Sequence, residues 1–524
     1  MKINITYLLV LIMCTAVGAS SNETTERPNI LIALMDDASY IHMGAYGCKW
    51  VKTPVFDKVA REGVLFTNTY TPNAKCAPSR AAILTGRNPW QLEEAANHWC
   101  YFPKKFKTYA EVFTENGYHV GYTGKGWQPG VVGDINGKKR KLIGQRYDEH
   151  KTIPPAKSMS RIDYSTNFRS FLDADTLDKP FCFWYGSREP HRAYEYGSGI
   201  KKGGKKYSDI DSVFSFWPDN KVVRADMLDY AFEVEYFDQH LGEMIQILEE
   251  RNELENTLIV VTSDNGMPFP RIKGQYYEHS NHMPFAVMWK NGIKYPGRTV
   301  HDYVSFIDIA PTFLEIAGIN GEKQGMFPIE GKSIVNLLQS TRNGNIDKSR
   351  DHIIIGKERN DVGRPNDEGY PVRGIVKGEF LYVHIFEPSR WPACDSITGY
   401  LDCDKGPTLN WCVASKDNPE TFKYWQLSLG LRNTHELYNI KLDPDCVDNL
   451  YEKPEYEKIA EDLKKQLFNK LKEQEDPRVL GNGHIFDAYE YANPRQKNYY
   501  NRYINGKAKR KRNFDINSFE IISD

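Results

Sequence analysis

The sequence predicts an α/β protein in which a central sheet is covered by helices on both faces, followed by a smaller α+β domain. Short apolar segments of β type alternate with segments of helical apolar spacing through the first 350 residues. Polar, chemically reactive segments follow several of these apolar runs, which is where the sites of α/β folds lie. The chain has 524 residues, too many for one hydrophobic core of ordinary size.

Each element of this prediction has its own pattern. Apolar residues recur at helical spacing between 227 and 248, which predicts a long amphipathic helix. A short helix ends at Gly86, since glycine commonly terminates helices. The expected strands are 29–34, 64–69, 118–122, 181–185 and 258–262, and the expected helices are 54–62, 79–84, 106–115 and 224–251. We therefore predict a main domain at 28–350.

The character of the chain changes after about residue 350. Strands are expected at 353–355, 380–385 and 436–440, with a helix at 455–472, which defines a C-terminal subdomain at 351–475. Residues 476–524 show no clear period, and their last part is basic, most densely at 507–512. This basic tail is either a solvated segment or a patch for an anionic polymer.

The first residues have the pattern of a secretory signal. Lys2 precedes an apolar run at 5–13, and small residues lead to a cleavage site after Ala19. The run is too short to span a bilayer, so no membrane span is predicted. A buried N-terminal helix is the alternative. Residues 1–19 therefore predict a protein exported to the periplasm or secreted.

Composition excludes some functions. Lys and Arg total 68 against 69 Asp and Glu, so no global field favours nucleic acid as a partner. No CxxC pair occurs, which makes zinc fingers and thioredoxin-like chemistry weak interpretations. Cys394, Cys403 and Cys412 are close enough in sequence for one disulfide, although spacing does not determine pairing.

The most informative segment is Cys76-Ala-Pro-Ser-Arg80, followed by Thr85-Gly86. A cysteine at a helix start meets outward-facing N–H groups, and Arg80 lies one turn further on. Such a position lowers the pKa of a thiol and favours anions, so a thiolate nucleophile with a histidine partner is one interpretation.

The same segment resembles the signature of the sulfatase family. In that family a formylglycine-generating enzyme oxidises the cysteine to formylglycine (3-oxoalanine), an aldehyde that hydrates to a diol. The resemblance covers about residues 28–450. It implies an alkaline-phosphatase-like fold and hydrolysis of a sulfate ester or sulfamate, with one diol hydroxyl attacking sulfur and the other expelling sulfate.

Metal ligands are implied by the same resemblance. Asp36 and Asp37 follow the first strand, and Asp264 and Asn265 follow strand 258–262, where the family has its two ligand pairs. Alone, each pair is an ordinary acidic turn. Together with an oxygen of converted Cys76 they form a hard-oxygen set that suits Ca²⁺, with Mg²⁺ as the alternative.

Basic residues match the family's sulfate-binding groups. Lys125 ends one strand, His191 follows another, and Lys273 lies in the loop after Asp264. The resemblance implies that Arg80 and the two lysines stabilise negative charge, and that His191 donates a proton to the leaving oxygen. Many relatives have a histidine where this chain has Trp127, which leaves the role of that histidine to Gln128 or His98.

The expected substrate is a sulfated polysaccharide or its oligosaccharides. Within the family the chain looks most like the heparan N-sulfatase branch, which implies glycosaminoglycan-like or ulvan substrates. His98, Arg359 and Arg373 are candidates for substrate binding, because arginine pairs well with a uronate carboxylate. Two other functions stay open: a phosphodiesterase or phosphonate hydrolase on the same fold, and a non-catalytic polysaccharide-binding protein with unmodified Cys76.

Overall fold

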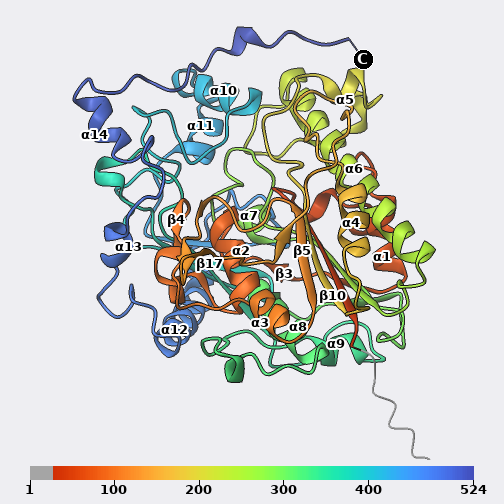
Figure 1. Ribbon diagram of the computed structural model, residues 1–524. Coiled ribbons are helices and arrows are strands. Elements are labelled where there is room, and N and C mark those ends of the chain that lie inside the picture. Colours follow the sequence, from red (N-terminus) through yellow and green to blue (C-terminus); the bar gives the residue numbers. More distant parts are fainter. Residues whose placement is uncertain (1–26, 524) are drawn as a thin grey trace, which may run out of the picture.

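The computed structural model describes residues 27–523, so the expected signal at 1–19 lies outside the described residues. An eight-stranded mixed sheet occupies the centre of the larger part of the chain (Figure 1). Only β12 runs against the other strands of this sheet. The strand order is β13 (Arg298–Val300), β2 (Val64–Phe66), β12 (Phe285–Met288), β11 (Thr257–Ser263), β1 (Asn29–Met35), β10 (Phe181–Gly186), β5 (His119–Gly124) and β9 (Gln145–Arg146).

Helices cover both faces of this sheet, as the alternation along β1 shows. Ile30, Ile32 and Leu34 belong to one hydrophobic core, and the residues between them belong to the other. The first core includes α2 (Cys76–Thr85), α3 (Tyr109–Glu115) and α8 (Ile309–Ile316). The second includes α1 (Pro54–Arg61), α4 (Tyr164–Asp173) and α6 (Lys221–Glu250). The predicted fold class is confirmed.

Helix ends follow local sequence signals. The Asn220 side chain accepts hydrogen bonds from the N–H groups of Val222 and Val223, which starts α6 at Lys221. Gly86 ends α2 with a φ of 69°, a left-handed conformation that glycine adopts without strain. The expected strand at 64–69 is divided into β2 and β3 (Thr69–Tyr70), and β3 pairs with β14 (Val304–Ser305).

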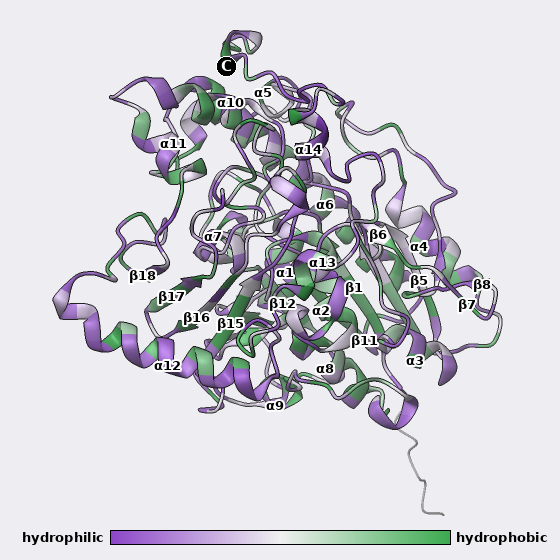
Figure 2. Ribbon diagram, turned by 90° about the vertical axis from the view of Figure 1, so that its left-hand side faces the viewer, coloured by the Kyte–Doolittle hydropathy of each residue, from purple (hydrophilic) through white to green (hydrophobic). Residues whose placement is uncertain are grey.

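A second, antiparallel sheet follows in the chain. It consists of β15 (His352–Lys357), β16 (Val372–Lys377), β17 (Phe380–Ile385) and β18 (His435–Asn439). Helix α12 (Glu457–Glu473) lies along one face of it (Figure 2) and packs Leu463 and Leu467 against the sheet. The other face packs against Tyr70 and Tyr276 of the larger part. Strand β16 was not predicted, because Gly374 and the charged Arg373 interrupt its apolar pattern.

Shorter elements connect these parts. The remaining helices are α5 (Ser198–Lys201), α7 (Glu278–Asn281), α9 (Val335–Gln339), α10 (Pro407–Ala414), α11 (Phe422–Leu429), α13 (Ile485–Ala488) and α14 (Tyr499–Ile504). The remaining strands are β4 (Cys100–Tyr101), β6 (Gly130–Val131), β7 (Asp134–Ile135) and β8 (Lys138–Lys139).

The segment after α12 packs several buried side chains against the protein, whereas the basic residues Lys507, Lys509, Arg510 and Lys511 are exposed. In Figure 1 this blue segment passes from α12 through α13 and α14 and then crosses the top of the molecule. Asp476, Phe486, Tyr491 and Tyr499 are buried along it. Aromatic side chains between the basic residues supply this burial, and a charge count alone does not reveal it.

Cysteine and hydrophobicity patterns give two further results. All eight cysteines within 27–523 are free thiols, so the disulfide considered among Cys394, Cys403 and Cys412 is absent from this part of the chain. Over the same residues, no helix combines the length and the apolar character needed to cross a membrane.

Candidate active site

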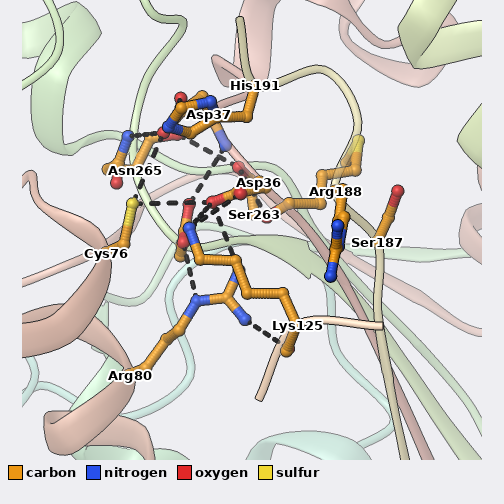
Figure 3. Close-up of polar contacts among 12 residues, drawn as sticks. Asp36, Asp37, Cys76, Arg80, Lys125, Ser187, Arg188, His191, Ser263 and Asn265 are labelled. Atoms are coloured by element: carbon orange, nitrogen blue, oxygen red, sulfur yellow. Dashed lines mark hydrogen bonds and ion pairs between the residues drawn. The ribbon is translucent and has the colours of Figure 1, made fainter. Parts of the chain in front are cut away.

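Four parallel strands end side by side and deliver polar residues to one edge of the central sheet. Asp36 and Asp37 follow β1, Asp264 and Asn265 follow β11, Lys125 follows β5, and His191 lies in the loop after β10. The strand ends are close because Gly124 and Gly186 pair across β5 and β10, where a Cβ on either glycine would collide with backbone. Figure 3 shows the side chains of Asp36, Asp37, Asn265, Lys125 and His191 converging with Cys76 and Arg80 of α2.

The centre of the site is a buried acidic cluster. Ligand atoms of Asp36, Asp37, Asp264 and Cys76 lie within 4.8 Å of one another. Asp37 has a φ of 78°, and its backbone N–H donates to Asp264 Oδ1 at 3.0 Å. Carboxylates gathered away from water repel one another, so such a cluster requires cationic partners.

Asn265 lies next to this acidic cluster. Its Nδ2 donates to Asp37 Oδ1 at 2.7 Å and to the Gly266 carbonyl at 2.9 Å, and the carbonyl fixes the orientation of the amide because it can only accept. The Asn265 Oδ1 atom is left buried without a hydrogen-bond partner. A buried amide oxygen without a partner, in a residue that contacts Asp37, and three carboxylates together make a donor set of the type that a hard cation such as Ca²⁺ prefers.

Three basic side chains, those of Lys125, Lys273 and Arg80, balance the negative charge of the carboxylates. Lys125 Nζ lies 2.6 Å from Asp36 Oδ1, and Lys273 Nζ lies 2.6 Å from Asp37 Oδ2. Burial is the largest single effect and works to raise the pKa of Asp36, but Lys125, His191 and Arg80 together outweigh it and lower this pKa to about 2.

Arg80 is held rigidly at the base of the site. Its Nε lies 2.8 Å from Asp264 Oδ2, and one terminal nitrogen donates to the carbonyls of Lys125 and Gly126 at 2.8 and 3.0 Å. Burial raises the pKa of Asp264, although Arg80 opposes that effect. Arg80 therefore links α2 to the ends of β11 and β5.

Cys76 occupies the first position of α2, directly beside the acidic cluster. Its Sγ is 3.5 Å from Asp36 Oδ1 and 3.8 Å from Asp37 Oδ1. Burial, together with Asp264 and Asp36, raises the pKa of this thiol, although Lys125 and Lys273 oppose the rise. The expectation of a lowered thiol pKa was wrong, because burial is the largest effect on this thiol and the two carboxylates add to it. The geometry therefore does not support the interpretation of Cys76 as a thiolate nucleophile with a histidine partner.

His191 faces the cluster with one ring nitrogen. Its Nδ1 bonds the Arg192 carbonyl at 2.6 Å and therefore carries a hydrogen, because a carbonyl can only accept. Its Nε2 lies 3.8 Å from Asp37 Oδ2. Buried Glu189 fixes the loop by accepting from Tyr164 and Ser187 at 2.9 and 2.7 Å. The loop thus positions Nε2 as the nitrogen available for chemistry.

A cavity of about 590 Å³ opens over these groups. Cys76, Lys125, His191 and Lys273 line it. The wall includes predicted His98, whose Nδ1 is 3.2 Å from Asp361, together with Trp99, Gln128 and Pro129. Trp127 lies outside this wall: its indole donates to the Ala77 carbonyl at 3.0 Å, which gives it a structural role.

Two predicted substrate-binding arginines do not reach this cavity. Arg373 is fully buried and pairs with Asp476 and Glu358, both at 2.8 Å. Arg359 donates to the Tyr489 carbonyl at 2.7 Å and lies over the ring of Tyr491. A buried guanidinium needs partners within the protein, because water does not reach it. Both side chains therefore hold the residues that follow α12 in place. This corrects their assignment as substrate ligands.

Other cavity residues were missed by the sequence prediction. Asp404 lies 2.8 Å from Lys273, and nearby cations, Lys273 foremost and His191 next, hold the pKa of Asp404 far below its usual value against the effect of burial. Lys75 pairs with Asp361 at 2.8 Å. The C-terminal segment adds Gln496, Lys511 and Arg512 to the lining. The dense positive charge at 507–512 was the one feature of the sequence that pointed to these cavity residues.

Fold and site together define an α/β protein with a buried acidic cluster next to Cys76, the first residue of α2. The sequence profile of the family described as Sulfatase matches residues 28–319. The chain belongs to the sulfatase family, whose named relatives are sulfuric ester hydrolases. The resemblance expected from Cys76–Arg80 is confirmed.

Individual relatives cover most of the chain. An ulvan-active sulfatase of Formosa agariphila is 28% identical over 87% of this chain and 82% of its own length. The human N-sulphoglucosamine sulphohydrolase is 26% identical over 90% and 93%. A structure solved with its substrate D-glucosamine-2-N,6-O-disulfate matches with a TM-score of 0.60 at 21% identity, over 86% of this chain and 99% of that one. This likeness shows the shared fold.

Proposed function

We propose that this protein releases sulfate from a sulfated polysaccharide or its oligosaccharides, with Cys76 converted to formylglycine. The main support for this proposal is the position of Cys76 among three buried carboxylates. Cys76 also lines a cavity together with Lys125, His191 and Lys273. Ca²⁺ would be held by Asp36, Asp37, Asp264 and the unpaired oxygen of Asn265. Formylglycine would supply a hydroxyl that attacks sulfur and a second one that releases the sulfate.

The surrounding side chains have separate roles in this proposal. Arg80, Lys125 and Lys273 supply positive charge where negative charge grows on the sulfate oxygens. Because Nδ1 of His191 is committed to the Arg192 carbonyl, Nε2 is the nitrogen that donates a proton to the leaving oxygen or nitrogen. Asp404 keeps Lys273 within reach of the cavity through their contact at 2.8 Å.

The substrate class follows from the relatives and from the charge of the site. One relative is named for activity on ulvan and another for N-sulphoglucosamine. We therefore propose a sulfated, uronate-containing saccharide, with an O-sulfate or an N-sulfate as the group removed. Export through a signal at 1–19 to the periplasm or the exterior, and maturation by a formylglycine-generating enzyme, belong to the same proposal.

A release assay tests this function. The purified protein is incubated with ulvan oligosaccharides, with heparan-type disaccharides and with a phosphonate monoester, and the free sulfate and the alcohol released from the phosphonate are measured. We expect sulfate from at least one saccharide and no hydrolysis of the phosphonate. Hydrolysis of the phosphonate alone would favour the phosphonate hydrolase alternative, and saccharide binding with no release would favour a binding protein.

A further inference from the structure

The C-terminal segment 494–514 forms part of the wall of the active-site cavity. Gln496, Lys511 and Arg512 line the cavity together with Cys76 and Lys125, although they follow them by several hundred residues. This segment lies beyond 28–319, the residues that the family profile matches. Its contribution to the site therefore lies outside the residues that the family profile matches.

Defined contacts hold the segment in this place. The guanidinium of Arg512 donates to the carbonyls of Gly399 and Tyr400 at 3.1 and 2.8 Å and to that of Cys403 at 2.5 Å. The hydroxyl of buried Tyr499 donates to the Lys509 carbonyl at 2.8 Å and accepts from the N–H of Lys511 at 3.1 Å. Because the backbone is anchored on both sides of Lys511, this exposed residue is held at the wall of the cavity.

The charge of the wall is not balanced within the cavity. Its two acidic side chains are already paired, Asp361 with Lys75 at 2.8 Å and Asp404 with Lys273 at 2.8 Å. Lys405 and Lys511 therefore have no carboxylate partner in the lining, and the Lys511 ammonium lies 4.3 Å from the centre of the Tyr499 ring.

The neighbours of Lys511 add to this excess of positive charge. Partial burial lowers the pKa of its ammonium group, and so do the cations Arg502, Arg512 and Lys405, while only Asp361 opposes them. An anion placed between Lys405 and Lys511 would relieve this repulsion and gain charge-assisted hydrogen bonds.

We propose that Lys511 and Lys405 form a subsite for a second anionic group of the substrate. That group is a carboxylate or sulfate on the sugar next to the one that loses its sulfate. The inference rests on the proposed function, since it extends the substrate from a single sulfated sugar to an anionic oligosaccharide. The basic run near the C-terminus is then a specificity element of the cavity.

Substrate pairs that differ in one charge test this subsite. The substrates are a sulfated disaccharide with an adjacent uronic acid and the same disaccharide with its carboxyl group reduced to an alcohol. We expect Lys511→Gln to lower the ratio of kcat/KM for the acid over the alcohol about tenfold, as loss of a charged hydrogen bond predicts. Lys509→Gln is the matched control, because Lys509 is exposed in the same segment and does not line the cavity. It should keep the wild-type ratio.

The outcomes separate the two proposals. Equal ratios for Lys511→Gln and Lys509→Gln would overturn the subsite while leaving sulfate release intact. If the wild-type protein releases sulfate from neither disaccharide, the proposed function fails instead. Calorimetric binding of the acidic disaccharide to Cys76→Ala, with and without Lys511→Gln, then tests the subsite by itself. A Kd about tenfold weaker in the double variant supports it, and an unchanged Kd refutes it.

Discussion

Arg80 and Asp264 form an ion pair of 2.8 Å in which neither side chain is exposed to solvent. The pair joins the helix that begins with Cys76 to the end of β11, so it connects the position of Cys76 to the acidic cluster. Removing one member of a buried pair leaves a charge in a medium of low polarity. The pair therefore contributes to the fold as well as to the site.

We expect Arg80→Met to destabilise the metal-free protein by about 3–5 kcal/mol, the usual cost of leaving a buried partner unpaired. Arg61→Met is the control, because the Arg61 side chain is 67% exposed and its nearest carboxylate, on Glu62, lies 3.7 Å away. It should change stability by less than about 0.5 kcal/mol. Urea unfolding of chelator-treated protein measures both, and similar losses in the two variants would contradict the prediction.

Cys76 should carry an aldehyde in active enzyme. The raised pKa of its thiol makes the unmodified side chain a poor nucleophile, and a serine there has no second hydroxyl with which to release sulfate. Mass spectrometry of the peptide that contains residue 76 checks the conversion. We expect Cys76→Ser to keep the wild-type unfolding transition and lose turnover. Full activity in a preparation with only intact thiol would exclude the mechanism.

Calcium should be required and should stabilise the protein. A free Ca²⁺ concentration of about 100 times Kd adds about 2.7 kcal/mol to the free energy of unfolding. We expect Asp37→Asn to lose this stabilisation and the sulfate-releasing activity, whereas Asp134→Asn, at an exposed position on β7, should keep both. Thermal unfolding with Ca²⁺, with Mg²⁺ and with chelator measures the effect. A fully active metal-free enzyme would disprove the assignment.

Acid should remove the contribution of Asp36 to stability. Its pKa is lowered from 3.8 to about 2 because Lys125, His191 and Arg80 together outweigh burial, the largest single effect. A carboxyl with a lowered pKa in the folded state stabilises the fold above its unfolded pKa, and this stabilisation is lost as the pH falls to the folded value. We expect the free energy of unfolding of the metal-free wild-type protein to exceed that of Asp36→Asn by about 2 kcal/mol at pH 5. This difference should shrink toward pH 2. A difference independent of pH would argue against the pairing.

His191 should matter most for poor leaving groups. Its Nε2 faces the cavity, so His191→Ala should slow sulfate release from a sugar by about 10²–10⁴-fold. An activated aryl sulfate needs little protonation and should lose far less. His301→Ala, at an exposed position, serves as the control for the loss of an imidazole. Equal losses on sugar and aryl substrates would remove His191 from the role of proton donor.

Local patterns predicted the elements that carry the centre of the site. Buried strands such as β1 and β11 appear as uninterrupted apolar runs, and the residues directly after them are the acidic ones of the cluster. Prediction failed where burial contradicts residue type. Arg373 is charged and fully buried, so its strand β16 lacked the expected pattern, and its pairing with Asp476 depends on a contact across 103 residues.

The sequence alone determined the family, the α/β class and the residues that meet at the strand ends, because these depend on short apolar runs and one contiguous motif. Only the tertiary structure decided which distant charges share the cavity. Asp404 reaches Lys273 across 131 residues, and Arg512 anchors the C-terminal segment beside Cys403 across 109 residues. Such pairings depend on how loops cross a folded surface. Periodicity within a short stretch of sequence contains no information about those crossings, because no local hydrogen-bond or packing pattern specifies them.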